Sequence, residues 1–402
     1  MSAPAVFDPF APGFADDPHP HYARLRAGSP VHRHPLGFWI LSGYDDVAAL
    51  QRAPHSVDEK NLVHRPAWKN DPAGPGKANR PMLGLSMLDR DPPEHTRLRR
   101  LVAATFTRRA VEAWGPRIEA LVDDALDRIA DAGGGDVVAE LAFPLPFTVV
   151  SLMLGIPVVE QARVRELSGT LVRALEPLVG AELHAQIRAA NHELTQMLRE
   201  IVVWKRSHPG DDLLTALLTA DDDGDVLGED ELVAQIMLLY VAGHETTVNL
   251  VANGVLALAR HPEQLRRLHA DPGLAAPTVE EVLRHDPPVQ LMRRITVEPL
   301  LVRDEEIPAG SFVLAALAAA NRDPDAFGPD ADEFRMDRPD AHRNLSFGAG
   351  VHHCLGAGLA RLEARAALGR FAARFPSVTV EDLEWNGRIN LRGPARLEIA
   401  VR

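Results

Sequence analysis

The chain has 402 residues, of which 46% are hydrophobic, and a formal net charge of −13. This acidity disfavours nucleic acid as a partner, and a single cysteine excludes internal disulfides and metal sites that need several thiolates. No stretch of about 20 apolar residues and no signal-peptide pattern occurs, so we expect no membrane anchor and a location in the reducing cytoplasm.

Neither a long linker nor an internal repeat divides the sequence. We therefore expect one domain over residues 1–402, and a monomer. The N-terminal part, roughly residues 1–90, is expected to be β-rich and to pack on a helical remainder. Short strands are predicted over residues 31–41, then a helix over Tyr44–Arg52. Residues 55–90 are polar and rich in Pro, Gly and Asn, which predicts a long loop.

Helical patterns dominate from residue 93 onward. The spacing of apolar residues predicts helices over residues 94–106, 109–132, 147–155, 158–175, 181–207 and 211–219. Residues 137–143 are apolar but run into Pro144 and Pro146, so no element is assigned to them.

The longest apolar helical run covers residues 229–260, and would be roughly 45 Å long at about 1.5 Å per residue. It is apolar nearly all round at residues 236–242, so it should be central and buried. Further helices are predicted over 262–268, 278–285 and 355–371, with short strands within 289–316 and a final hairpin turning at Asn386-Gly387. The sequence thus predicts a mainly α fold with a small, clustered β region.

The only cysteine lies in the most constrained stretch of the sequence, which reads Phe347-Gly348-Ala349-Gly350-Val351-His352-His353-Cys354-Leu355-Gly356. Its glycines let the backbone turn tightly and approach a flat object closely. Helix-forming sequence follows, and backbone N–H groups at a helix N-terminus stabilise a thiolate. The stretch therefore suits an electron-rich sulfur ligand to a metal. The alternative is a buried structural cysteine in a glycine-rich turn.

This pattern, Phe-Gly-x-Gly-x-His-x-Cys-x-Gly, resembles the haem-ligand loop of the cytochrome P450 superfamily. The chain is similar in length and motif order to the soluble bacterial (class I) members. The resemblance implies a triangular helical prism with a long central helix and a small β-rich region. It also implies haem b, iron protoporphyrin IX, with Cys354 as the thiolate ligand of the iron and Phe347, Gly348 and Gly356 beside the haem.

The predicted central helix carries Ala242-Gly243-His244-Glu245-Thr246-Thr247. Helix stability alone does not explain these residues in a buried helix. Gly costs about 1 kcal/mol there relative to Ala, and a Thr hydroxyl competes for carbonyls one turn back. A tolerated polar kink is the alternative. The resemblance implies an oxygen-activation groove, where Glu245 and Thr246 deliver protons through water and Ala242 and Gly243 leave space for dioxygen. His244 and Thr247 should face other helices.

Four basic residues match the family's contacts to the haem propionates. His95 and Arg99 lie four apart on one helical face, His352 precedes Cys354 by two residues, and Arg294 follows the helix stop at 287–288, with Arg293 as its rival. Taken singly, each is equally compatible with a solvated surface charge.

An acid and a guanidinium, Glu281 and Arg284, lie three apart on one helical face. Such a pair is commonly solvated, but the resemblance implies a buried pair that fixes the loop around the cysteine. The family usually adds a third partner, for which Arg338 is the candidate and Arg335 the rival.

The resemblance places the substrate pocket at residues 62–90, 175–179, 239–246, 289–292 and 389–390, which are mainly apolar. Basic residues in the first of these segments, Arg65, Lys69, Lys77 and Arg80, indicate either an anionic substrate group or a solvated loop.

The resemblance implies a monooxygenase that inserts one oxygen atom of O2 into an apolar small molecule, by hydroxylation of a secondary metabolite, steroid, terpenoid or fatty acid. Electrons would come from NAD(P)H through a ferredoxin, [2Fe–2S] or similar, and a ferredoxin reductase. A hydrogen-peroxide-driven peroxygenase and a haem-based sensor are the alternatives, and the presence of Glu245-Thr246 argues against both.

The resemblance places a basic patch beside Cys354, which is the expected docking face for the electron donor because small ferredoxins are acidic. Its members are Arg97, Arg100, Arg108, Arg109, Arg361 and Arg365. The alternative is that these residues are solvated helix charges.

Overall fold

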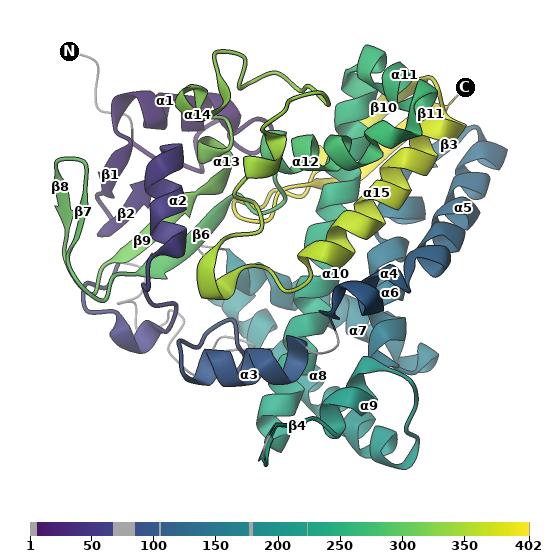
Figure 1. Ribbon diagram of the computed structural model, residues 1–402, viewed down its shortest axis with the longest axis horizontal. Helices are drawn as coiled ribbons and strands as arrows, with labels where there is room; N and C mark the ends of the chain where they lie inside the picture. The colour runs from purple at the N-terminus through teal and green to yellow at the C-terminus, as the bar shows by residue number, and fades with distance from the viewer. Residues whose placement is uncertain (1–5, 67–84, 104–105, 177–179, 223, 402) are drawn as a thin grey trace.

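The computed structural model describes residues 6–66, 85–103, 106–176, 180–222 and 224–401. Its helices are α1 (His19–Gly28), α2 (Tyr44–Arg52), α3 (Glu94–Ala103), α4 (Arg108–Glu112), α5 (Gly115–Ala132), α6 (Pro144–Leu154), α7 (Val158–Leu171), α8 (Ala181–Ser207), α9 (Leu213–Leu218), α10 (Glu229–Arg260), α11 (Pro262–Ala270), α12 (Ala275–His285), α13 (Leu317–Ala320), α14 (Pro324–Phe327) and α15 (Ala357–Arg374). Helices dominate, and the β-structure forms small separate sheets in different parts of the molecule (Figure 1), which confirms the predicted mainly α fold.

The strands are β1 (Val31–His34), β2 (Phe38–Leu41), β3 (Gly134–Asp136), β4 (Asp221–Asp222), β5 (Asp225–Val226), β6 (Leu291–Ile295), β7 (Leu300–Val302), β8 (Glu305–Ile307), β9 (Phe312–Ala316), β10 (Val378–Trp385) and β11 (Pro394–Val401). The main sheet has the order β1-β2-β9-β6, in which β2 and β9 are parallel and the other pairs antiparallel. A second sheet has the order β10-β11-β3. The N-terminal strand β2 thus pairs with a strand 274 residues later, since Trp39 lies opposite Val313.

Helix α10 runs through the middle of the molecule, with α15 and α5 on one side of it (Figure 1). Two hydrophobic clusters meet on it: residues 248–258 pack with α5, α12 and α15, and residues 232–241 pack with α6 to α9. Most side chains in both halves of α10 are buried, and residues 242–246 sit at the junction of the two clusters. Among the described residues, no helix has both the length and the apolarity to cross a membrane.

The predicted bounds of α2, α8 and α10 are confirmed, and three other predictions need correction. Helix α6 begins at Pro144, not at residue 147, because proline is tolerated in a first helical turn, and a π-helix (η5, Val138–Ala142) fills the unassigned stretch before it. The predicted helix 109–132 is divided into α4 and α5. The C-terminal hairpin does not turn at Asn386-Gly387, since β10 and β11 are joined by eight residues, 386–393.

Candidate active site

The loop before α15 presents Cys354. Gly348 and Gly350 both have φ near 69°, a left-handed conformation that favours glycine. A Cβ on Gly350 would lie 3.1 Å from the Gln51 carbonyl oxygen, so the loop also passes close to the backbone of the last turn of α2. The Cys354 N–H donates to the Phe347 carbonyl at 2.9 Å, which closes the loop. Gly356 differs from the other two, because its φ of −82° is open to any residue and it is the N-cap residue directly before α15.

The Cys354 side chain is exposed to solvent. Its surroundings have opposite effects on its pKa. Desolvation raises the pKa of Cys354, because protein atoms crowd the sulfur on its other sides. Backbone N–H groups of Gly356 and Ala357, together with the charges of Arg99 and Arg361, lower the same pKa. Desolvation is the larger effect, so the pKa of Cys354 is raised overall. The helix start and the two guanidinium groups oppose this rise, and a metal bound at the sulfur would stabilise the thiolate.

The predicted propionate contacts do come together in space. The rings of His95, on α3, and His352 lie 4.3 Å apart between centroids. Arg99 donates to the His353 carbonyl at 2.8 Å. Burial, followed by the charges of His95, Arg294 and Arg99, lowers the pKa of His352 to about 3, which places all four groups in one cluster. Both imidazoles are therefore neutral at physiological pH.

Arg294 and its rival Arg293 point to different surroundings. Arg293 is neutralised by Glu59 at 3.0 Å and Asp89 at 2.6 Å. Arg294 is 3% exposed, and burial lowers its pKa to about 10. Its one hydrogen bond to a described residue goes to the Arg293 carbonyl at 2.9 Å, and it forms no ion pair with a described carboxylate. Of the two, Arg294 is the cation left for an anionic ligand.

This cluster fits the two propionates of haem b. His95 Nδ1 and His352 Nε2 are buried without a hydrogen-bond partner among the described residues, and such orphaned polar atoms cost about 1–3 kcal/mol each. Carboxylates placed here would accept from the imidazoles and pair with Arg99 and Arg294. The basic cluster and the lone thiol close to it thus match a metal cofactor that carries two carboxylates.

The groove stretch of α10 differs from its surroundings in two ways. Ala242 is exposed although Val241 and His244 on either side are buried, so open space adjoins the middle of a buried helix. Thr246 Oγ1 donates to the Ala242 carbonyl at 3.2 Å, one turn back. A Cβ on Gly243 would lie 3.3 Å from Val150 Cγ2 on α6, so a small residue suits the close packing there.

The side chains expected to face other helices do so. His244 is 1% exposed and packs edge-on against Phe143, Phe147 and Tyr240, while its Nδ1 lies 2.7 Å from the Tyr240 carbonyl. Thr247 is buried as well. No hydrogen bond joins the side chains of Glu245 and Thr246, both of which are described residues. Its carboxylate is instead ion-paired with Arg388, in the loop between β10 and β11.

The buried pair on α12 has the predicted third partner. Arg284 and Glu281 are fully buried and joined by two hydrogen bonds of 2.7 and 2.8 Å. Arg338 adds a longer contact of 3.4 Å to Glu281 and bonds the Phe327 carbonyl at 2.8 Å. The side chain of the rival, Arg335, turns to Asp330 and Asp337, although its backbone N–H also donates to Glu281 at 2.8 Å.

Comparison with known proteins agrees with this geometry. A family model for cytochrome P450 matches residues 59–272 and 274–384. The chain belongs to the cytochrome P450 family. It is 42% identical to cytochrome P450 107B1 of Saccharopolyspora erythraea, covering 97% of this chain and 96% of the relative. It is 41% identical to the cytochrome P450 monooxygenase PikC of Streptomyces venezuelae, covering 100% and 95%. Structurally it is similar to P450BioI in complex with a hexadec-9Z-enoic acid-ligated acyl carrier protein, with a TM-score of 0.89, 30% identity, and coverage of 97% and 100%.

The enzyme is therefore a P450 monooxygenase of bacterial type with haem b as its cofactor. The residues named above carry the individual roles only as predictions, because the comparisons do not assign them.

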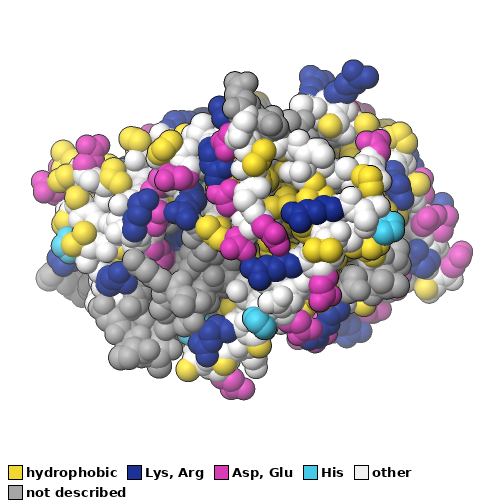
Figure 2. Space-filling model, turned by 90° about the horizontal axis from the view of Figure 1, so that it is seen from below, with side chains coloured by type: hydrophobic (Ala, Val, Ile, Leu, Met, Phe, Trp, Pro, Cys, Tyr) yellow, Lys and Arg dark blue, Asp and Glu magenta, His cyan; other side chains and the backbone are white. Residues whose placement is uncertain are grey.

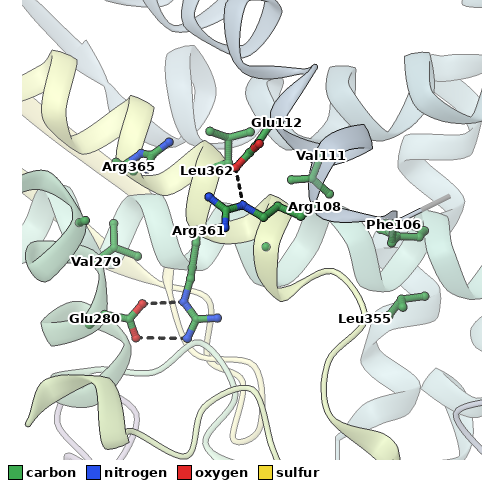
Figure 3. A pocket seen from close by; sticks show the side chains of 12 residues that line it. Phe106, Arg108, Val111, Glu112, Val279, Glu280, Leu355, Arg361, Leu362 and Arg365 are labelled. Carbon is green, nitrogen blue, oxygen red and sulfur yellow. Dashed lines mark hydrogen bonds and ion pairs between the residues drawn. The ribbon is translucent and has the colours of Figure 1, made fainter. Parts of the chain in front are cut away.

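A pocket of about 400 Å³ opens on the side of Cys354, between α4, α12 and α15 (Figure 3). Its apolar lining includes Val111, Val279 and Leu355. Two ion pairs stand at its rim, Arg361 with Glu280 at 2.5 Å and Arg108 with Glu112 at 2.7 Å (Figure 3). The Arg361 guanidinium also lies 4.4 Å from the centre of the Phe347 ring, which connects this pocket to the cysteine loop.

The predicted basic patch is more neutral than the sequence indicates. Arg97 belongs to ion pairs with Asp225 at 3.1 Å and with Glu231, so it is not a free docking charge. Arg108 and Arg361 are paired as well, whereas the exposed Arg109 and Arg365 have no ion pair to a described carboxylate. From below, basic and acidic side chains alternate with exposed hydrophobic ones (Figure 2).

The substrate-pocket segments are only partly within the described residues. Lys69, Lys77 and Arg80 lie outside them, as do residues 177–179. Glu176 lies within a predicted pocket segment and Arg388 directly precedes another, but the sequence assigned neither residue a role. Neither belongs to a motif, and each acts on a residue more than 140 positions away, so no local signal could have revealed these contacts.

Proposed function

We propose that this P450 inserts one oxygen atom of dioxygen into an apolar small molecule, by hydroxylation of a secondary metabolite, steroid, terpenoid or fatty acid. Its electrons come from NAD(P)H through a ferredoxin and a ferredoxin reductase, and it acts in the cytoplasm as a single-domain monomer. The observation that supports oxygen activation is the exposed Ala242 in a buried helix, with Thr246 one turn away and Glu245 beside it.

Haem, when bound, supplies the iron at which dioxygen is activated. The chain's own residues would do the rest. His95, Arg99, Arg294 and His352 would bind the propionates and so fix the orientation of the cofactor. Thr246 Oγ1 would exchange its bond to the Ala242 carbonyl for one to water, and Glu245 would hand protons from solvent to that water. The apolar walls along α10 would exclude other water from the substrate.

Replacing Thr246 with alanine tests this assignment. Thr246→Ala should keep haem and substrate binding, since the hydroxyl bonds only its own helix, but should lower product formed per NAD(P)H several-fold and release peroxide instead. Thr246→Ser should restore most of the ratio, and Thr247→Val, a matched change one residue on, should leave it unaltered. An unchanged ratio in Thr246→Ala would remove Thr246 from proton delivery.

The same product assay distinguishes the two alternative functions, a peroxygenase and a haem-based sensor. A peroxygenase would form product from hydrogen peroxide at least as fast as from NAD(P)H with ferredoxin and reductase. A sensor would bind haem and consume no NAD(P)H with any substrate. The presence of both Glu245 and Thr246 in the groove supports the oxygen-dependent reaction over each of them.

We also propose that an acidic ferredoxin docks beside the pocket of Figure 3, which the exposed Arg365 lines, and that the exposed Arg109 of α4 contributes to the same docking face. Rim charges act mainly on the association rate, and salt screens them over about 8 Å at physiological ionic strength. Stopped-flow reduction should therefore slow as salt rises, and Arg109→Glu or Arg365→Glu should slow it several-fold at low salt. Arg396→Glu, on β11, is the control. Indifference to salt and to both reversals would place the docking face elsewhere.

A further inference from the structure

The eight-residue connection between β10 and β11 reaches back to the middle of α10. Asn386 shapes it: its N–H bonds the Gly393 carbonyl at 3.0 Å, its amide donates to the Leu391 carbonyl at 2.8 Å, and its side-chain oxygen accepts from Arg388 N–H at 3.0 Å. The Arg388 guanidinium then forms the ion pair with Glu245. The two side chains are 19% and 12% exposed, so water screens the pair only weakly.

A second carboxylate fixes this connection from the other side. Glu176 follows the short 3-10 helix η6 (Val172–Leu175) and accepts from the backbone N–H groups of Ile389 at 2.7 Å and Asn390 at 3.1 Å. Asn390 in turn donates its amide to the Leu175 carbonyl at 3.1 Å. Burial raises the pKa of Glu176, whereas these N–H donors and the nearby charge of Arg388 lower it. The position of Arg388 therefore depends on Glu176.

Among the described residues, Glu245 has no strong partner other than Arg388. One carboxylate oxygen is taken by Arg388, and the other lies 3.9 Å from His244 Nε2, beyond hydrogen-bond distance. Burial lowers the pKa of His244, so the imidazole is neutral and adds little charge. Arg388 is therefore the cation that decides where this carboxylate points. Removing one partner of a largely buried pair leaves the other charge uncompensated and free to seek new contacts.

We propose that Arg388 is a positioning residue for proton delivery, which holds the Glu245 carboxylate beside the oxygen groove, and that Glu176 holds Arg388 in turn. This inference rests on the proposed function, because it assigns the partner of an acid in that reaction. Its consequence is a physical link between two parts of the site. The segment ending at Glu176 adjoins the expected substrate pocket, so its position sets the position of the proton-donating acid.

The first test compares Arg388→Gln, Glu245→Gln and the double variant, with an optimal substrate, in normal and deuterated water. Each single change should lower product per NAD(P)H two- to tenfold and raise the solvent isotope effect on product formation. The double variant should be no worse than either single one, because both changes disable the same unit. Arg388→Lys should recover part of the ratio, and Glu176→Ala should resemble Arg388→Gln.

Arg396→Gln is the matched control, because Arg396 is an exposed arginine of the same hairpin that pairs with Asp382 and Glu398. It should leave the product ratio and the isotope effect unchanged. A loss in Arg388→Gln without a change in isotope effect would mean a merely structural role and would overturn the proposal. Additive losses in the double variant would overturn it as well.

A second measurement does not depend on turnover. The midpoint of urea unfolding should fall in Arg388→Gln in the wild-type background, and the same change should shift it clearly less in the Glu245→Gln background. Equal shifts in both backgrounds would show that the pair does not form, and would overturn the inference. If Thr246→Ala leaves the product ratio intact, the proposed proton route fails, whereas normal coupling in Arg388→Gln alone would overturn only the role of Arg388.

Discussion

Replacing Cys354 with histidine is expected to abolish the long-wavelength Soret band that the reduced carbon monoxide complex of a thiolate-ligated haem shows. The chain has no second cysteine, so no other thiolate can take over as ligand. Monooxygenase activity should fall to background, since the thiolate is the electron donor that favours O–O cleavage. Absorption spectroscopy of the reduced complex measures the first effect, and product formation measures the second.

His353→Ala is the matched control, because the His353 side chain is exposed and Arg99 uses only its backbone carbonyl. This variant should keep the band. Persistence of the band in Cys354→His would mean that the sulfur of Cys354 is not the iron ligand. If Cys354→His binds no haem, Cys354→Ser provides the test instead. This variant keeps the size of the side chain and should bind haem without showing the thiolate band.

Arg284→Ala is expected to destabilise the fold by about 3–5 kcal/mol, the range found for breaking a buried ion pair by removing one partner. Arg284 satisfies Glu281 and also the carbonyls of Asn321, Ala331 and Glu333. All of these would be left unpaired in the interior. The loss is a large part of the roughly 5–15 kcal/mol by which proteins are stable, so the urea midpoint should drop steeply and haem retention with it.

The neighbouring arginines provide graded controls. Arg338→Ala should be the second most harmful change, because this buried side chain joins Glu281 to Asp330. Arg335→Ala should be nearly neutral, since its half-exposed side chain forms surface pairs worth about 0–1 kcal/mol. Equal effects of Arg335→Ala and Arg284→Ala would contradict the assignment of the buried network.

Short-range sequence patterns predicted those helices and loops of this P450 whose conformation depends on residues near in sequence. Apolar residues on all faces located α10 to the residue, and a heptad-like stripe did so for α8. The glycine-rich stretch around Cys354 pointed to the ligand loop, because positive φ angles there require glycine. Proline misled the prediction at residue 144, where the missing N–H is harmless in a first helical turn.

The parts that were missed depend on contacts distant in sequence. Nothing near Arg97 indicates that Asp225 and Glu231 neutralise it, and nothing near Glu245 indicates Arg388. Likewise, the sequence favoured Arg294 over Arg293 only through the family resemblance, and only the fold shows that Glu59 and Asp89 lie beside Arg293. Charge partners across a fold follow from tertiary packing, which a single sequence does not reveal.

The parallel pairing of β2 with β9 bears on how the chain folds during synthesis. Trp39 pairs with Val313, so β2 cannot complete its hydrogen bonds on that side until more than three-quarters of the chain has left the ribosome. Closing a loop of this length carries an entropic penalty that only many cooperative contacts offset. A nascent chain that stops short of β9 would expose the edge of β2, and this unpaired edge could pair with a wrong strand. Chaperone dependence should therefore be greatest just before residue 316 emerges.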